Sequence, residues 1–148
     1  MTGKVIAVNI SEKKGVSKHP VDFIECVENF GINGDAHASE GIKRQVSLLG
    51  LESINKFREN KKAVGLCEGK FAENITTEGI TLYELPVGTR LKIGGSIHEV
   101  SQIGKKCHAD QGCEIARLYG QCVMPKEGIF TIVIKGGIVK AGDTIEII

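Results

Sequence analysis

The sequence is poor in aromatic residues and lacks tryptophan altogether. Phe, Trp and Tyr together make up 5% of the 148 residues. Proteins that bind single-stranded nucleic acid stack bases on aromatic side chains, so this composition argues against such a surface. The formal net charge is only +1, which excludes the strong global field that attracts nucleic acid or an anionic membrane. We therefore expect neither nucleic acid nor a membrane as a partner.

Segments typical of export or membrane insertion are also missing. The apolar run near the N-terminus is too short for a signal peptide, and no cleavage-like segment follows it. No window reaches the length of a membrane-spanning helix. We therefore expect a cytoplasmic protein with reduced thiols, because an odd number of cysteines without a secretory signal does not suggest a disulfide framework. The five cysteines are Cys26, Cys67, Cys107, Cys113 and Cys122.

Three common local signatures are absent from the chain. It has no glycine-rich phosphate loop of the nucleotide or dinucleotide type. It has no Gly-x-Ser-x-Gly motif, which marks one large class of serine hydrolases. It also has no Cys-x-x-Cys pair, the spacing that makes short zinc sites recognisable.

Glycine and short apolar runs are what the sequence has in abundance. It contains 19 glycines and only 3 prolines, with 41% hydrophobic and 25% charged residues. These proportions are typical of a globular protein, and 148 residues suit one domain with one core. We therefore predict a single domain that spans residues 1–148.

The apolar pattern predicts seven or eight short strands and one or two helices. Glycine-separated strands without a βαβ alternation favour a mainly β fold, a barrel or curled sheet with a few short α-helices. Gly94-Gly95 between two strands is typical of a hairpin. Apolar residues three apart predict a helix over Leu51–Asn60, and a second short helix is predicted over Cys113–Tyr119. The strands expected are Val5–Ile10, Val21–Phe30, Arg44–Leu49, Arg90–Ile93, Ser96–Ile103, Phe130–Ile134 and Thr144–Ile148, although the alternation of the second breaks at Ile24-Glu25.

A cysteine flanked by cations follows the predicted strand that ends at Ile103. Lys105 and Lys106 precede Cys107, and His108 follows it. Neighbouring positive charge raises the thiolate fraction of a cysteine and therefore its reactivity. Cys107 is the candidate reactive thiol, and the alternative is a half-exposed cysteine in a basic surface turn.

Two further cysteines follow Cys107 closely and raise the question of a metal site. Cys107, His108, Cys113 and Cys122 are four soft ligands within sixteen residues, a set that suits zinc or an iron–sulfur cluster. Their spacing lacks the usual close pair of cysteines. The alternative is that Cys113 and Cys122 are small apolar residues, one on a short helix and one in a strand.

A second group of candidates lies around the glycine-rich turn at residues 31–38. Arg44 offers a planar fork suited to phosphate or carboxylate, and His37 titrates near neutral pH. The alternative is that Asp35 only caps local amides while His37 lies in water. Asn74, in the segment 73–77, offers hydrogen bonds at a fixed place, or else belongs to the polar edge of a strand.

Taken in order, these segments resemble the MOSC domain, which is named after the C-terminal part of eukaryotic molybdenum cofactor sulfurases. The resemblance runs from Val5 to Ile147, and the chain is similar to the small stand-alone bacterial members. The segments that carry it are Gly31–Ala38, Arg44–Leu49, Phe71–Thr76, Leu85–Thr89, Ile103–His108 and Met124–Phe130. It implies a β-barrel-rich fold with a few helices and a single cysteine proposed to carry sulfur, which falls on Cys107.

Family resemblance also implies action on the molybdenum cofactor (molybdopterin). The chain would bind the cofactor and act as a sulfur carrier or sulfurtransferase through a Cys107 persulfide. An external donor such as a cysteine desulfurase would load it, with molybdenum cofactor biosynthesis proteins or molybdoenzymes as partners. The alternatives are a non-catalytic cofactor carrier and a metal-binding structural module. Cys113 and Cys122 depart from the single-cysteine pattern and leave a second role open.

The chemistry of the cofactor matches the polar residues already named. Arg44, Lys105 and Lys106 suit its phosphate, and Asp35 and Asn74 suit the donors and acceptors of its pterin. Pyridoxal phosphate is associated with the fused sulfurases, but their large desulfurase domain is absent here, so we do not expect this cofactor. The predicted cofactor-binding residues are Asp35, His37, Arg44, Asn74, Lys105, Lys106 and His108.

Overall fold

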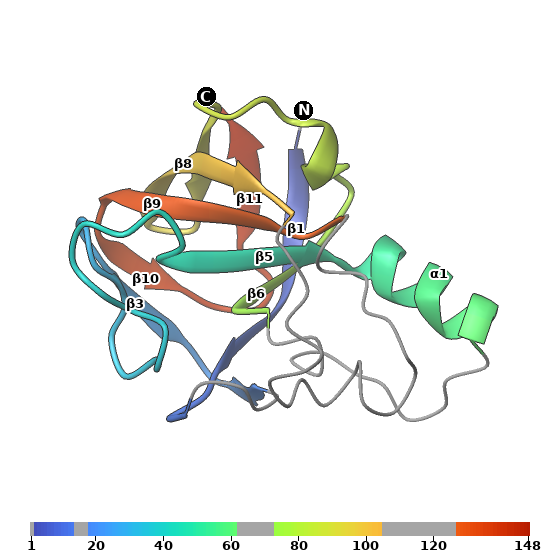
Figure 1. Ribbon diagram of the computed structural model, residues 1–148, viewed down its shortest axis with the longest axis horizontal. Helices are drawn as coiled ribbons and strands as arrows, with labels where there is room; N and C mark the ends of the chain where they lie inside the picture. The colour runs from blue at the N-terminus through green and yellow to red at the C-terminus, as the bar shows by residue number, and fades with distance from the viewer. Residues whose placement is uncertain (1, 14–17, 62–72, 105–126) are drawn as a thin grey trace.

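The strands of the protein curl into a closed barrel (Figure 1). The computed structural model describes residues 2–13, 18–61, 73–104 and 127–148. Within these residues the barrel sheet contains β1 (Thr2–Ile10), β2 (His19–Val21), β5 (Val46–Gly50), β6 (Ile75–Glu78), β7 (Arg90–Ile93), β8 (Ser96–Ile103), β9 (Ile129–Lys135) and β11 (Thr144–Ile147). Hydrogen bonding follows the order β11-β7-β8-β9-β5-β6-β1, and β1 pairs back onto β11. Seven strands therefore close the barrel, and β2 pairs with the far end of β1.

Smaller elements surround the barrel. A second sheet, made of β10 (Gly137–Val139), β3 (Ile24–Val27) and β4 (Gly31–Ile32), lies beside it. Helix α1 (Leu51–Lys61) follows β5 directly and projects away from the barrel, and the short helix η1 (Leu82–Glu84) lies after β6 (Figure 1). None of the helices in the described ranges is long and apolar enough to cross a membrane.

Alternating side chains build the barrel core. On β7 the exposed Arg90 and Lys92 alternate with the buried Leu91 and Ile93, because successive residues of a strand point to opposite faces. Gly94 makes the following turn possible, since its φ of +55° lies in a region that side chains rarely adopt. The core cluster takes residues from strands all around the barrel, including Val5, Leu48, Ile75, Leu91, Val100, Ile129 and Ile145.

The mainly β barrel predicted from the sequence is confirmed, as are the hairpin at Gly94-Gly95 and the helix that begins at Leu51. The single strand predicted over Val21–Phe30 is wrong. The chain changes sheets at Asp22–Phe23, because β2 pairs with β1 whereas β3 pairs with β10 and β4. Asn29 then turns the chain with a φ of +52°. The helix predicted over residues 113–119 lies outside the described residues.

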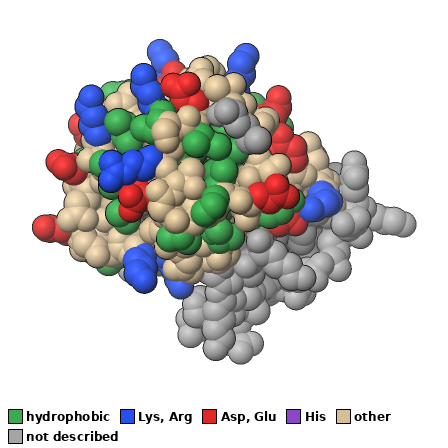
Figure 2. Space-filling view, turned by 90° about the horizontal axis from the view of Figure 1, so that it is seen from above, with side chains coloured by type: hydrophobic (Ala, Val, Ile, Leu, Met, Phe, Trp, Pro, Cys, Tyr) green, Lys and Arg blue, Asp and Glu red, His purple; other side chains and the backbone are tan. Residues whose placement is uncertain are grey.

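Charged side chains of both signs are interspersed on the face shown in Figure 2, around an apolar centre. The described residues on this face form no continuous area of one sign. This distribution agrees with the net charge of +1.

A histidine is enclosed in the barrel wall. His98 on β8 is fully buried, with Nε2 2.8 Å from Ser96 Oγ and Nδ1 2.9 Å from Thr131 Oγ1. Burial lowers the pKa of His98 from 6.5 to about 4, because a charged ring would lose its hydration there. The folded protein therefore holds His98 neutral, with a hydroxyl group at each ring nitrogen.

Stability should therefore fall as the pH decreases from 6.5 to 4. In this window the unfolded chain takes up a proton on His98 and the folded protein does not, so acid favours unfolding. The loss should reach about 3 kcal/mol, while above pH 6.5 this residue adds no pH dependence. Urea unfolding of the wild type and of His98→Gln at a series of pH values measures the effect. The exposed His19→Gln is the control, and an unchanged pH slope in His98→Gln would contradict the assignment.

Candidate functional site

Several predicted site residues lie outside the described residues. They are Lys105, Lys106, Cys107, His108, Cys113 and Cys122. The reactive-thiol and metal-site hypotheses that rest on them stay predictions. Among the residues that the structure does describe, no group of three or more His, Cys, Asp or Glu side chains could hold a metal ion. The other four candidates, Asp35, His37, Arg44 and Asn74, are described in full.

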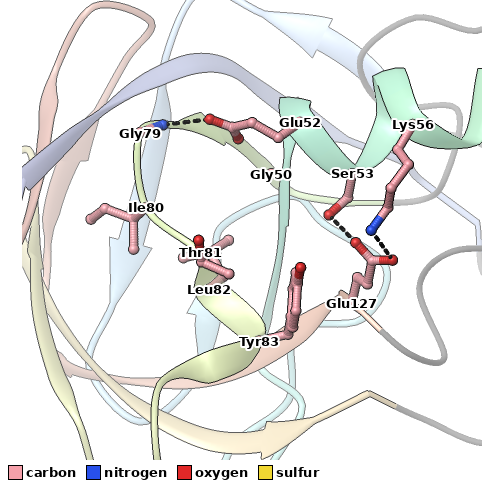
Figure 3. A pocket seen from close by; sticks show the side chains of 10 residues that line it. All are labelled: Gly50, Glu52, Ser53, Lys56, Gly79, Ile80, Thr81, Leu82, Tyr83 and Glu127. Atoms are coloured by element: carbon pink, nitrogen blue, oxygen red, sulfur yellow. Dashed lines mark hydrogen bonds and ion pairs between the residues drawn. The ribbon is translucent and has the colours of Figure 1, made fainter.

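The residue after β8 and the residue before β9 are joined by a hydrogen bond. Between them in the sequence lies segment 105–126, which contains Cys107 (the Cys107 segment). Gly104 N donates to Gly128 O at 2.7 Å. Glu127 accepts from Ser53 Oγ at 2.7 Å and pairs with Lys56 Nζ at 3.0 Å, both on α1 (Figure 3). Residues 104 and 127–128 are thus held at one place on the barrel. We call this place the root of segment 105–126, which lies outside the described residues.

The same Ser53–Lys56–Glu127 group borders a cavity of about 260 Å³ between α1 and η1. Figure 3 shows Tyr83 below Glu127, and Glu52 reaching across to Gly79. Glu52 accepts from Gly79 N at 2.8 Å, and Lys56 lies 5.9 Å from the Tyr83 ring centre. The charged side chains of this cavity therefore all have partners within it, Glu52 in the backbone of Gly79 and Lys56 in Glu127, and these contacts anchor α1.

Arg44 lies beside this root. Its Nε donates to Gln102 Oε1 at 3.2 Å, and Gln102 Nε2 donates to Gly104 O at 2.8 Å. The guanidinium carbon lies 5.6 Å from the centre of the Phe130 ring, a cation–π distance. Arg44 is exposed, and in the described part of the chain no carboxylate pairs with it. The structure therefore holds the Arg44 guanidinium in place close to Gly104, the last described residue before the Cys107 segment.

Asp35 follows β4 in the sequence and is buried beside Ser11, the residue after the end of β1. The chain turns after β4, where Asp35 N donates to Ile32 O, and the next residue donates its N–H to Ser11 O. The Asp35 carboxylate accepts from Lys18 Nζ at 2.7 Å, from Ser11 N at 3.1 Å and from His37 N at 3.1 Å. Burial alone would raise the pKa of Asp35, but the hydrogen bonds and the Lys18 charge hold that pKa below its usual value. The carboxylate is therefore ionised at neutral pH.

Lys18, Asp35 and His37 form a cluster, and Lys18 is the member that the sequence did not indicate. Lys18 is 4% exposed. Besides its contact with Asp35, its ammonium lies 3.3 Å from Ser11 Oγ and 3.1 Å from His37 Nδ1. In the sequence it belongs to a polar loop with other lysines, which looks like a solvated stretch. No local signal separates Lys18 from Lys13, because its partner Asp35 is 17 residues away.

His37 completes the cluster with a ring that is partly exposed. Its side chain is 39% exposed, and Nδ1 lies 3.9 Å from Asp35 Oδ2. The sequence placed Asp35 and His37 together, and the structure does bring them into contact. It adds Lys18 between them.

Asn74 lies fully inside the structure. Its Oδ1 accepts from Ser47 N at 3.0 Å and from Ser47 Oγ at 3.1 Å, and its Nδ2 donates to Asn9 O at 3.1 Å. The neighbouring Glu73 is also fully buried and accepts from Thr76 Oγ1 at 2.8 Å. Asn74 therefore ties β1, β5 and the start of β6 together.

The four described candidates follow one line across the outer face of the barrel. Ser47 lies opposite Phe130 in the β5–β9 ladder, on the face away from Leu48 and Ile129, which belong to the core. Asn9 lies on β1, and Ser11 follows directly after the end of this strand. We call this line the outer row; its members are Arg44, Phe130, Ser47, Asn74, Asn9, Ser11, Asp35, Lys18 and His37. Arg44 is at one end of it and the Lys18–Asp35–His37 cluster at the other.

Comparisons with known proteins agree on the fold. The family model described as the MOSC domain matches residues 33–146. The YuaD protein from Bacillus subtilis has a TM-score of 0.80 at 20% identity, covering 99% of this chain and 96% of that one. YiiM from Escherichia coli has a TM-score of 0.69 at 21% identity, covering 100% and 70%. YiiM from Geobacillus stearothermophilus has a TM-score of 0.70 at 18% identity, covering 99% and 75%. No curated protein is significantly similar in sequence.

Proposed function

Because the chain belongs to the MOSC domain family, we propose that it binds the molybdenum cofactor and carries sulfur on Cys107 as a persulfide. The family match over residues 33–146 confirms the resemblance seen in the sequence. The domain takes its name from molybdenum cofactor sulfurase, which is consistent with an association with this cofactor. The persulfide and the binding residues are our proposal.

Arg44 is the observation that carries the proposal. A guanidinium that lies over the Phe130 ring and is fixed through Gln102 loses little freedom when it binds an oxyanion. Since Gln102 also holds Gly104, this anion site is built next to the start of the Cys107 segment. These residues suit a ligand with a phosphate, as molybdopterin has, and Gly104 precedes the proposed carrier Cys107 by only three residues in the sequence.

The sulfur step that we propose needs no added oxidant. The Cys107 thiolate attacks the outer sulfur of a persulfide on the donor protein, the donor sulfur–sulfur bond breaks, and the donor leaves as a thiolate. Cys107 then holds the sulfur as a persulfide for an acceptor. When bound, the cofactor supplies the molybdenum centre at which sulfur is needed. A cysteine desulfurase is the proposed donor, and cofactor biosynthesis proteins or molybdoenzymes are the proposed acceptors.

Cofactor binding is tested with cofactor released from a molybdoenzyme under reducing conditions. The protein is mixed with it and passed over a desalting column, and molybdenum and pterin fluorescence are measured in the protein fraction. We expect molybdenum and pterin to elute together with the protein in a fixed ratio. If both elute only in the small-molecule fraction, the proposal fails at its first step.

The protein alone should not extract sulfur from cysteine. That reaction needs pyridoxal phosphate on a Schiff-base lysine, which must be able to lose its proton. Lys18 is the buried lysine among the described residues, and its pairing with Asp35 at 2.7 Å favours the ammonium form. Incubation with cysteine and pyridoxal phosphate should therefore yield no sulfide, no alanine and no aldimine absorbance. Catalytic release of alanine without an added desulfurase would show that the chain does not depend on a donor.

A further inference from the structure

The cavity between α1 and η1, which we call the α1 cavity, contains a binding site for a cation, and the chain's own Lys56 occupies it (Figure 3). Lys56 Nζ lies 3.0 Å from Glu127 Oε2 and 5.9 Å from the centre of the Tyr83 ring, over its face. A carboxylate and an aromatic ring are the two kinds of group that hold an ammonium or a guanidinium in proteins. Glu127 and Tyr83 therefore form a recognition pair, and Lys56 is the cation that they already hold.

Lys56 can leave this pair at little cost, whereas Glu127 is held in place. The Lys56 side chain is 54% exposed and that of Glu127 is 16% exposed. An exposed lysine–carboxylate pair contributes little to stability, because water solvates the ammonium well when it separates. Glu127 has two further anchors, since Ser53 Oγ donates to its Oε1 at 2.7 Å and the next residue, Gly128, accepts from Gly104 N. A second cation can therefore replace Lys56 while Glu127 keeps its position.

The space and charge of the α1 cavity suit a cationic head group. Its volume is about 260 Å³, and a water molecule takes up only about 30 Å³ in the liquid. Two carboxylates and one ammonium line it, those of Glu52, Glu127 and Lys56, which gives a net charge of −1. The buried Ile80 and Leu82 add apolar side chains to the lining. If Lys56 leaves, the lining keeps both carboxylates and attracts a cation more strongly.

The geometry of the pair favours a guanidinium over an ammonium. The ammonium of Lys56 pairs with one oxygen of Glu127, Oε2. A guanidinium is planar, so two of its N–H groups can bond both oxygens of a carboxylate while its face lies on an aromatic ring. Oε1 can take part, because a carboxylate oxygen accepts a second hydrogen bond beside the one from Ser53. An arginine that enters the α1 cavity therefore gains a contact that Lys56 lacks.

We propose that the α1 cavity binds the guanidinium of an arginine on a partner protein, which replaces Lys56 at Glu127 and Tyr83. Glu127 directly follows segment 105–126 in the sequence, and Gly128 holds Gly104 at its other end. A partner that binds here contacts the root of the segment that contains Cys107. The identity of this partner as the sulfur donor rests on the proposed function, whereas the binding of a guanidinium does not.

Binding is tested by NMR on the free protein with two matched probes, N-acetylarginine amide and N-acetylcitrulline amide. Citrulline has nearly the same shape as arginine but no charge. The chain has two tyrosines, so Tyr83→Phe assigns the Tyr83 ring signals of protein labelled with ¹³C-tyrosine. We expect the arginine probe to shift these signals in a saturable way and the citrulline probe to leave them in place. Equal shifts with both probes, or no shift in either the wild type or Lys56→Met, would overturn the proposal.

Variants then show whether the probe and Lys56 compete for Glu127. Lys56→Met should tighten binding of the arginine probe about two- to fivefold, the usual range for an exposed ion pair that no longer has to break. Glu127→Gln keeps the shape of the side chain but not its charge, and should lose the saturable shift. Lys92→Met, which removes an exposed lysine from β7, is the matched control. Equal tightening in Lys92→Met and Lys56→Met, or unchanged binding in Glu127→Gln, would contradict the site. Should Glu127→Gln fail to fold, Lys56→Met and the citrulline probe still decide.

The partner is tested by loading the protein with sulfur from a cysteine desulfurase in the presence of each probe. We expect the arginine probe to slow the loading and the citrulline probe to leave its rate unchanged. Loading that neither probe slows would overturn the role of the α1 cavity in donor binding. Absence of loading even without a probe would be a failure of the carrier proposal and would remove the donor with it, whereas the Tyr83 signals would still decide whether the cavity binds a guanidinium.

Discussion

Replacing Cys107 by serine should abolish sulfur transfer and leave cofactor binding in place. A hydroxyl group of similar size cannot form a persulfide, so the loss should be complete rather than partial. Cofactor affinity should change little, because in our account the fork of Arg44 provides the anion contact. The measurement is transfer of labelled sulfur from a loaded cysteine desulfurase to the protein and then to an acceptor.

Cys26 offers a matched control within the same chain. It is 2% exposed on β3, and burial raises the pKa of its thiol to about 11. A thiol that is both covered and protonated is a poor nucleophile. Cys26→Ala should therefore keep full sulfur transfer if the fold is intact. Transfer that survives in Cys107→Ser, or that is lost in Cys26→Ala with the fold retained, would assign the carrier to another residue.

Replacing Arg44 by alanine should weaken cofactor binding by about 1.5–3 kcal/mol, the usual range for a hydrogen bond to a charged group. This corresponds to roughly 10- to 150-fold in the dissociation constant. The affinity of Arg44→Lys should lie between those of the wild type and Arg44→Ala, because lysine keeps the charge but lacks the planar fork that lies over Phe130. Equilibrium binding of the released cofactor, measured by protein-bound molybdenum, gives the three affinities.

Arg90 is the control for a general effect of removing positive charge. It is also exposed, but its Nε lies 3.3 Å from Glu99 Oε1, so it has a carboxylate partner. Arg90→Ala changes the net charge by the same amount and should leave cofactor affinity within about twofold, as expected for a screened surface charge. Equal weakening in both variants would point to a non-specific field. Unchanged affinity in Arg44→Ala with an intact fold would remove Arg44 from the site.

The barrel was predictable because its strands carry their own signals. The β7–β8 hairpin alternates exposed and buried residues around Gly94-Gly95, and both features can be recognised within ten residues of sequence. The predicted strand over Val21–Phe30 failed for the opposite reason. Whether this stretch continues in one sheet or moves to a second depends on β1 and β10, which lie far from it in sequence.

The polar residues of the outer row show the same limit. Asp35 and His37 are two residues apart, so their contact was within reach of sequence reasoning. The hydrogen bonds from Asn74 to Asn9 and Ser47 join residues 65 and 27 positions apart. Lys18 is not distinguished locally from the exposed Lys13. Burial of a polar side chain depends on what packs over it, and an isolated local pattern does not contain that information.

Mass spectrometry is the most direct test of the central claim, that Cys107 carries sulfur. The protein is incubated with a loaded persulfide donor, digested without reductant, and each cysteine-containing peptide is weighed. We expect one extra sulfur atom on the peptide that contains Cys107 and none on the peptide that contains the buried Cys26. No extra sulfur on any peptide would contradict the carrier role and favour the non-catalytic cofactor carrier instead. Extra sulfur only on Cys113 or Cys122 would contradict the assignment to Cys107.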